Sequence, residues 1–197
     1  MKDNLRIAIL FTLVTTVMFG LLYPLGVTGL AQLLFPAQAN GSLLAKNGQA
    51  VGSKLLGQMF SSPGYFHPRP SGAGTGYDAS QSGSPNLAPT NRALIERVKV
   101  DVDKLHAENP RAAIPIDLVT TSASGLDPEI SPAAAEFQVP RVARARGMRE
   151  AEIRALVAKH TLKRQLGFLG EPRVRVLELN LDLDATHPNQ RQTSGFS

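Results

Sequence analysis

The chain has 197 residues, a formal net charge of +5, 6% aromatic residues, no tryptophan and no cysteine. The missing cysteine excludes a cysteine nucleophile, and the shortage of aromatic rings argues against a platform on which bases or sugars stack. The positive charge is modest for this length and does not by itself indicate nucleic-acid binding, so we expect no nucleic-acid partner.

The first predicted element is residues 7–35, a stretch of 29 residues without an acidic, basic or histidine side chain. As a helix it would extend about 44 Å, whereas the hydrocarbon core of a bilayer is about 30 Å thick. The stretch therefore predicts a transmembrane helix. Its extra length is taken up by tilt, by a bend at Pro24 or by entry into the headgroup region.

A cleaved secretory signal is the competing interpretation of this segment. Lys2 and Arg6 would form its basic region, and Ala-Gln-Ala at 37–39 fits a cleavage site. The apolar core of a signal usually runs about 7–15 residues, and this one is much longer. We therefore favour an uncleaved anchor, with cleavage after Ala39 left as the alternative.

Charge predicts the orientation of the anchor. Lys2 and Arg6 lie on its short N-terminal side, whereas the first basic residue after it is Lys46. Positive residues near a membrane segment stay in the cytoplasm. This predicts a cytoplasmic N-terminus at residues 1–6, a periplasmic domain at residues 36–185 and a flexible tail at residues 186–197.

Residues 61–90 are predicted to form a long irregular loop, because 16 of these 30 residues are Gly, Pro or Ser. One interpretation is a flexible surface segment. The other is a docking loop, because aromatic, amide and guanidinium groups are unusually dense in and just after it. These groups belong to Tyr65, Phe66, His67, Arg69, Tyr77, Asn86, Asn91 and Arg92.

The rest of the chain mixes short helical and extended patterns, which predicts a single α+β (or α/β) extracytoplasmic domain. We expect strands at 53–60, 114–119 and 172–185, and helices at 92–106, from 131 to a stop or kink at Pro140, at 141–147 and at 149–165. The strand at 172–185 changes parity at Val176–Leu177, which predicts a bulge or break there. The basic residues between 141 and 164 indicate either a solvated helical face or a surface that binds anions.

Motifs for catalysis are missing from the sequence. The four histidines have no metal-ligand spacing, no G-x-S-x-G elbow is present, and Gly-Ala-Gly-Thr-Gly at 72–76 lacks the context of a phosphate-binding loop. We therefore expect no catalytic residues, no metal site and no directly bound cofactor. The alternative is a stand-alone, signal-anchored periplasmic enzyme, such as a hydrolase whose site is assembled in space from distant residues.

Three blocks in fixed order carry a family resemblance: LLGQMFSSPGYFHPRPS (55–71) with SQSGSPNLAPTN (80–91), IPIDLVTTSASGLDPEISPAAAEFQVPRVARARG (114–147), and HTLKRQLGFLGEPRVRVLELNLDLD (160–184). With the anchor before them, they closely resemble the KdpC family, the C subunits of the Kdp potassium-transporting ATPase. The family usually reads S-G-G-S-N-L-G-P-T-N where this chain has SGSPNLAPTN (82–91), and Pro85 and Ala88 would change the local loop geometry, since glycine alone freely adopts positive φ.

The resemblance implies a non-catalytic subunit of a complex in the bacterial inner membrane. Its implied partners are a channel-like subunit that selects potassium and a P-type ATPase subunit that hydrolyses ATP, and this subunit is needed for their assembly and activity. The family is also described as a catalytic chaperone that raises the affinity of the ATPase subunit for ATP. Because the charge pattern places this domain outside, we expect its effect on ATP to be indirect. The D-K-T-G phosphorylation motif of P-type ATPases is absent.

Two sets of residues are therefore hypothesised to contact partner subunits or lipid. In the anchor, small residues permit close approach of partner helices, although they could also simply face lipid. In the domain, the loop at 61–90 would cover the outer face of the channel-like subunit. The candidate contact residues are Gly20, Gly26 and Gly29 in the anchor, and Gln58, Tyr65, Phe66, Arg69, Asn86 and Asn91 in the domain.

Overall fold

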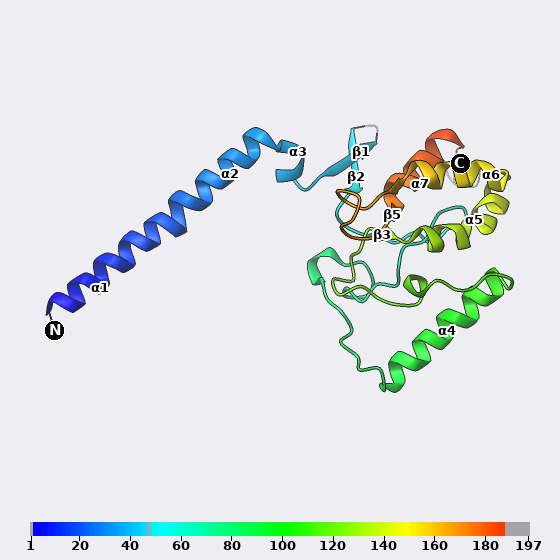
Figure 1. The fold of residues 1–197 in the computed structure, drawn as a ribbon, viewed down its shortest axis with the longest axis horizontal. Coiled ribbons are helices and arrows are strands. Elements are labelled where there is room, and N and C mark those ends of the chain that lie inside the picture. Colours follow the sequence, from blue (N-terminus) through cyan, green and yellow to red (C-terminus); the bar gives the residue numbers. More distant parts are fainter. Residues whose placement is uncertain (1, 47, 188–197) are drawn as a thin grey trace, which may run out of the picture. The chain divides into compact units, whose positions relative to one another are not determined.

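A computed structural model describes residues 2–46 and 48–187 of the chain. The chain divides into two compact units, Met1–Val51 and Gly52–Ser197. Helices and short strands are both present in the second unit (Figure 1), so the predicted α+β class is confirmed. The predicted flexible tail at 186–197 falls almost entirely outside the described residues.

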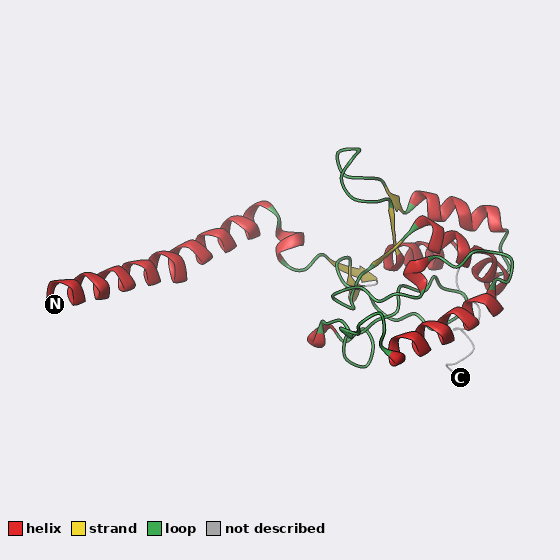
Figure 2. Cartoon of the chain, turned by 60° about the horizontal axis from the view of Figure 1, so that its bottom comes forward, coloured by secondary structure: helices red, strands yellow, loops and turns green. Residues whose placement is uncertain are grey.

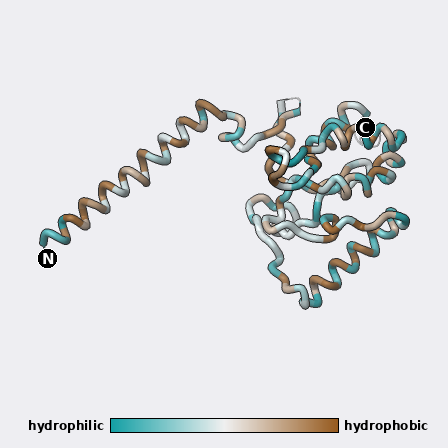
Figure 3. The backbone as a smooth tube through the Cα atoms, in the orientation of Figure 1, coloured by the Kyte–Doolittle hydropathy of each residue, from teal (hydrophilic) through white to brown (hydrophobic). Residues whose placement is uncertain are grey.

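The first unit contains one long apolar helix, Lys2–Leu34, of 33 residues. It comprises α1 (Lys2–Thr15), a π-helical segment (Thr16–Leu22) and α2 (Tyr23–Leu34). None of its side chains is buried, and Figure 3 shows apolar residues along most of its length after a hydrophilic N-terminal end. The helix is long and apolar enough to cross a membrane, which is consistent with a single-pass anchor.

The π-helical segment has a local cause in Pro24. Proline lacks an N–H, and its ring clashes with the carbonyl four residues earlier, which here belongs to Gly20. Immediately before Pro24, the N–H of Tyr23 donates to the carbonyl of Met18, five residues back. This wider turn accommodates the proline within one continuous helix.

One short helix and a two-stranded hairpin follow the long helix. They are α3 (Pro36–Ala39), β1 (Leu43–Lys46) and β2 (Gln49–Ser53), and β1 pairs with β2. The predicted strand at 53–60 is therefore wrong, because the strand ends at Ser53. Beyond it, Gly57 donates its N–H to the carbonyl of Leu126 and packs so closely that a Cβ would lie 2.6 Å from the carbonyl oxygen of Asp127. Residues after Ser53 are thus held by this close contact between two backbone segments, in place of the strand pairing that was predicted.

The second unit is built on a three-stranded antiparallel sheet in the order β3-β5-β4. Its strands are very short: β3 (Glu129–Ile130), β4 (Thr161–Leu162) and β5 (Arg173–Arg175). Its helices are α4 (Arg92–Glu108), α5 (Pro132–Arg146), α6 (Glu150–Lys159) and α7 (Val176–Thr186), with 3₁₀ turns at Ala79–Gln81 and Ile116–Leu118. Loops make up much of this unit (Figure 2).

The helix predictions are largely confirmed, with one correction at Pro140. Asn91 caps α4 and Ser131 caps α5, and each side chain accepts a hydrogen bond from the first turn. Helix α5 is not interrupted at Pro140 but continues to Arg146, where Gly147 ends it in the left-handed conformation with φ 65°. Helix α6 ends at Lys159, earlier than predicted, and β4 follows.

Two predicted strands are wrong. The segment at 114–119 forms a 3₁₀ turn, and the segment at 172–185 is a strand only at Arg173–Arg175. The predicted break at Val176 is confirmed, but helix α7 follows it. Its buried residues Val176, Leu177, Leu179, Asn180 and Leu183 are spaced by one, two, one and three, which places them on one broad helical face.

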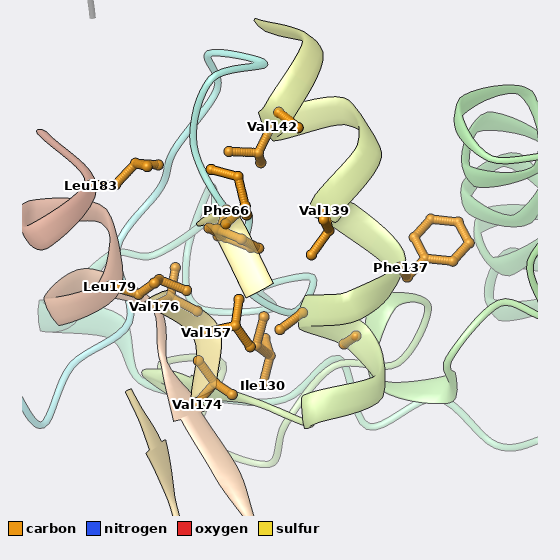
Figure 4. Close-up of a cluster of buried hydrophobic side chains, with 14 of the residues drawn as sticks. Phe66, Ile130, Phe137, Val139, Val142, Val157, Val174, Val176, Leu179 and Leu183 are labelled. Carbon is orange, nitrogen blue, oxygen red and sulfur yellow. The ribbon is translucent and has the colours of Figure 1, made fainter. Parts of the chain in front are cut away.

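The hydrophobic core lies between α5, α6, α7 and the sheet. Figure 4 shows Phe66, which comes from the irregular loop, among Val139 and Val142 of α5 and Leu179 and Leu183 of α7. Because Phe66 is fully buried, its backbone is also removed from water and needs hydrogen-bond partners.

Replacing Leu183 by Ala should lower the free energy of unfolding by about 2–5 kcal/mol, because deleting a buried side chain leaves a cavity. Leu183 is 0% exposed, whereas Val100 on α4 is 65% exposed. Val100→Ala is therefore the matched control, with an expected change within about 0.5 kcal/mol. Urea unfolding of the detergent-solubilised chain, followed by circular dichroism, measures both. Equal losses would contradict the packing of α7.

Candidate functional site

The first half of the Gly/Pro/Ser-rich segment is held firmly by side chains of α5 and α7. We call residues 62–71 the clamped loop. The side-chain amide of Asn180 pairs with both backbone groups of Phe66: its Oδ1 accepts from the N–H at 2.9 Å, and its Nδ2 donates to the carbonyl at 2.9 Å. Asn180 is itself 2% exposed.

Gln138 of α5 does the same for the next residue. Its Oε1 accepts from the N–H of His67 at 2.8 Å, and its Nε2 donates to the carbonyl of His67 at 3.0 Å. A carboxamide carries one acceptor and one donor group, so it satisfies both backbone groups of one residue. Two amides thus supply the hydrogen bonds that a neighbouring strand would otherwise provide.

Two arginines of α5 bind the start of the clamped loop. Arg141 donates to the carbonyls of Pro63 and Tyr65 and to Glu108. Arg146 donates to the carbonyl of Gly64 at 2.7 Å. The sequence allows two interpretations of the basic residues in this region, a solvated helical face or an anion-binding surface. Both are wrong for Arg141 and Arg146, because their guanidinium groups bind the loop.

A buried charge network completes this contact. The side chain of Arg146 is 1% exposed and pairs with Asp184 of α7 at 2.9 Å. The hydroxyl of Tyr65 donates to the same carboxylate at 2.9 Å, and the Arg146 guanidinium lies 4.8 Å from the centre of the Tyr65 ring. Burial and the bond to Asp184 raise the pKa of Tyr65, so its hydroxyl stays a donor. The flexible-surface interpretation is therefore wrong for the clamped loop.

The end of the clamped loop is tied to the segment before β3. Arg69 donates to Asp127 at 3.1 Å and to the backbone at Thr120 and Thr121. The hydroxyl of Tyr77 donates to the carbonyl of Arg69, and burial raises the pKa of this tyrosine. This part of the loop is also ordered by specific polar contacts.

The other domain residues predicted to contact partners lie in different surroundings. Gln58 is half-buried, and its side-chain oxygen lies against Gly52, where a Cβ would collide with it. Asn91 caps α4, and its Oδ1 accepts from the N–H of Ala93 at 2.9 Å. Asn86 is exposed and adopts a positive φ of 50°, in a stretch (85–91) that is exposed throughout. Its role in partner contact stays a prediction.

Burial changes how the candidate residues could act. Tyr65 and Phe66 are 8% and 0% exposed, so they hold the loop in place and present little surface of their own. In the first unit, Gly20, Gly26 and Gly29 lie on an exposed helix, and a Cβ at Gly26 or Gly29 would meet nothing within 4 Å. Tyr65 and Phe66 therefore contribute by fixing the shape of the loop. The glycines of the long helix, in contrast, leave open surface on it.

Two hollows flank the clamped loop in the second unit. The larger, about 630 Å³, lies between the connection from β4 to β5 and the segment around Ile116. The smaller, about 230 Å³, lies between α4 and the loop and is lined by His67, Tyr77 and Glu108 among others. Among the residues that the structure describes, no group of three or more His, Asp or Glu side chains could hold a metal ion.

Sequence reasoning missed the residues that hold the clamped loop. Asn180 and Gln138 stand between apolar neighbours in LELNLDL and AEFQVPR, and an amide inside an apolar run is the signal that was available. Its partner cannot be read from the sequence, because the paired backbone lies 114 residues away for Asn180 and 71 residues away for Gln138.

The comparisons with known proteins cover both units. A family model described as "K+-transporting ATPase, c chain" matches residues 5–185. This chain belongs to the KdpC family. One similar protein, from Koribacter versatilis, is 61% identical over 95% of this chain and 97% of its own length, and is named "Potassium-transporting ATPase KdpC subunit".

Relatives with the same name occur in other bacteria. The protein of Acidobacterium capsulatum is 58% identical over 94% of this chain and 100% of its own length. That of Bradyrhizobium diazoefficiens is 56% identical over 93% of this chain and 98% of its own length. In this KdpC-family chain the match includes the anchor, the clamped loop and both helices that hold the loop.

Replacing Asn180 by Leu should lower the free energy of unfolding by roughly 2–5 kcal/mol, because two buried backbone groups of Phe66 each lose a partner at about 1–3 kcal/mol. It should also expose the clamped loop to limited proteolysis. Gln165→Leu, on the exposed connection after β4, is the matched amide-to-leucine control. Unfolding curves and protease digestion of both variants check this; an Asn180→Leu protein with wild-type resistance would refute the clamp.

His67 should make stability depend on pH. Burial lowers the pKa of His67 below its ordinary value of 6.5, and the nearby Arg141 guanidinium adds to this. The unfolded chain then binds a proton at higher pH than the folded chain, so stability falls as the pH drops below about 6.5 toward the folded-state pKa. Carboxylates with lowered pKa values, such as Asp182, change the stability of the protein only at more acidic pH.

The measurement is the denaturation midpoint at a series of pH values between neutrality and mild acid. His67→Gln should flatten the slope in this range, because glutamine does not titrate. His106→Gln, at an exposed position of α4, serves as the control and should keep the wild-type slope. An unchanged slope in His67→Gln would show that another group causes the pH dependence.

Proposed function

We propose that this chain is a non-catalytic accessory subunit of a potassium-transporting ATPase complex in the bacterial inner membrane. The observation that carries the proposal is the match to the C-chain family over residues 5–185, together with relatives above 50% identity that are named as potassium-transporting ATPase subunits. Its partners in that complex would be a channel-like subunit that binds potassium and the P-type ATPase subunit.

The anchor supports the proposed location. Residues 7–35 carry no charge, and the exposed apolar helix Lys2–Leu34 needs a surrounding of lipid or partner helices to cover it. Lys2 and Arg6 on the N-terminal side support an orientation in which the second unit would lie in the periplasm. The chain would thus span the membrane once, with its N-terminus in the cytoplasm.

The proposed role is assembly and stabilisation of the complex. The chain lacks the D-K-T-G motif that P-type ATPases phosphorylate, so ATP hydrolysis would belong to the ATPase subunit. Because ATP is cytoplasmic and the domain is placed outside, any rise in ATP affinity would be transmitted through the anchor, as a coupling free energy between sites. Potassium and ATP are handled by the complex, and no cofactor is assigned to this chain.

The loop at 61–90 retains its proposed role on the outer face of the channel-like subunit. The ordered clamped loop would present a fixed shape, and the exposed stretch at 85–91 with Asn86 and Asn91 would make the direct contacts. A preformed surface loses little conformational entropy on binding, which favours assembly.

Mild-detergent affinity purification from potassium-starved cells tests the proposal. Tagged wild-type chain should bring down a P-type ATPase and a large multi-spanning subunit in near-equal amounts, as measured by mass spectrometry. Recovery of a monodisperse chain alone would refute membership in such a complex.

Replacing Gly26 and Gly29 by Leu should loosen the complex, because the two added side chains prevent close approach of a partner helix. A loss of about 1–2 kcal/mol in helix association would lower co-purified ATPase roughly fivefold or more. Val27→Leu, in the same turn, is the matched control and should retain the partners. Full co-purification of the double variant would mean that this face contacts lipid.

A further inference from the structure

The residues that fit a signal-cleavage site form a helical turn in the structure. Ala37 and Ala39 are the small residues that a secretory signal carries just before its cleaved bond, which here would join Ala39 to Asn40. Helix α2 ends at Leu34, so this bond lies just beyond the apolar helix, where such a signal is cut. The segment therefore has both the composition and the position of a cleavage site.

A peptidase needs its substrate backbone in an extended form, because extended peptides bind by pairing their N–H and carbonyl groups as an added strand. This segment instead forms α3, which Figure 1 shows as a separate short helix after α2. The N–H of Asn40, which belongs to the bond in question, donates to the carbonyl of Pro36 at 3.1 Å. The N–H of Ser42 donates to the carbonyl of Ala37 at 2.8 Å. The backbone groups that an enzyme would bind are thus already paired.

Helix α3 depends on the side chain of Asn40, because four residues are too few to form a stable helix by themselves. The Nδ2 of Asn40 donates to the carbonyl of Pro36 at 2.7 Å and to the Oε1 of Gln32 at 3.1 Å. Its Oδ1 accepts from the Nε2 of Gln32 at 3.3 Å. We call the paired side chains of Gln32 and Asn40 the amide lock. It ties the residue after the scissile bond to the last turns of α2.

The membrane setting strengthens the amide lock. Gln32 lies near the end of the apolar helix, and an unpaired amide at the edge of the hydrocarbon region is costly. The length of the helix does not remove the cleavage site, because tilt or entry into the headgroups still leaves the following residues at the membrane surface. Cleavage of a folded segment follows the population of its open form. The stability of α3 therefore decides whether the bond is reached.

We propose that the bond between Ala39 and Asn40 is a latent site for the peptidase that removes secretory signals, kept intact because α3 and the amide lock hold it in a helical turn. When the turn opens, water adds across the peptide bond and leaves a carboxylate on Ala39 and a free amino group on Asn40. The product, residues 40–197, no longer carries the anchor. The proposal rests on the proposed orientation, with this segment on the periplasmic side, and not on the identity of the partner subunits.

The test follows variants of the full-length chain, tagged at its C-terminus, in growing cells. Gln32→Leu with Asn40→Ala removes all three side-chain hydrogen bonds and keeps the small residues at positions 37 and 39. Gln38→Gly weakens α3 by a different route, because glycine disfavours a helix. Thr28→Leu, one turn before Gln32, is the matched control. It also replaces a polar side chain of α2 by leucine, but it leaves the amide lock in place.

Immunoblots should show a shorter fragment of the double variant, at least about fivefold more abundant than in the wild type, because losing such hydrogen bonds raises the open population by roughly this factor. Sequencing of the fragment should start at residue 40. Gln38→Gly should give a fragment with the same start, whereas Thr28→Leu should stay intact. Adding Ala39→Leu to the double variant should restore the intact chain, because leucine is too large for the position before the cut.

An intact double variant would overturn the proposal, because it would show that the long apolar helix alone prevents cleavage. Equal cleavage of Thr28→Leu would also overturn it, since the added apolar side chain and not the loss of the lock would then be the cause. A fragment that starts at another residue would place the cut elsewhere and reject this site. These results leave the recovery of partner subunits by the wild-type chain unchanged, so co-purification judges the proposed function separately.

Discussion

The second unit depends on how it satisfies the buried backbone of its irregular loop. Phe66 enters the core, but the Pro- and Gly-rich sequence around it cannot form a ladder that would pair its N–H and carbonyl groups. Asn180 and Gln138 take the place of a neighbouring strand and pair both groups of Phe66 and His67. Without these amides, burying the phenyl ring would leave up to four unpaired polar groups.

Two helices are organised by this requirement. Helix α5 carries Gln138, Arg141 and Arg146 toward the loop, and its apolar residues Val139 and Val142 pack in the core. Helix α7 carries Asn180 and Asp184, one turn apart, each directly after a buried leucine, Leu179 and Leu183. Each helix therefore joins core packing to loop binding, so the hydrophobic effect and the hydrogen bonds support the same arrangement.

An ordered loop matters for the proposed role of the chain. A subunit that assembles with others gains affinity when its surface is already in the bound shape, because less conformational entropy is lost. The clamped loop is held by internal hydrogen bonds to α5 and α7. The chain thus joins an apolar anchor to a domain whose long loop is mostly preorganised, and this suits an accessory subunit better than a flexible linker would.

The amino-acid sequence alone determined the long apolar helix, the α+β class, most of the helices and the family, because these depend on composition, local spacing and long motifs. Local patterns were misleading at 172–185, where alternation suggests a strand but burial of Leu179, Asn180 and Leu183 requires a helix. Only the tertiary structure decided that 62–71 is an ordered loop. The reason is physical: the amides that pair the backbone of Phe66 and His67 lie 114 and 71 residues away, and no local pattern records which amide meets which backbone group.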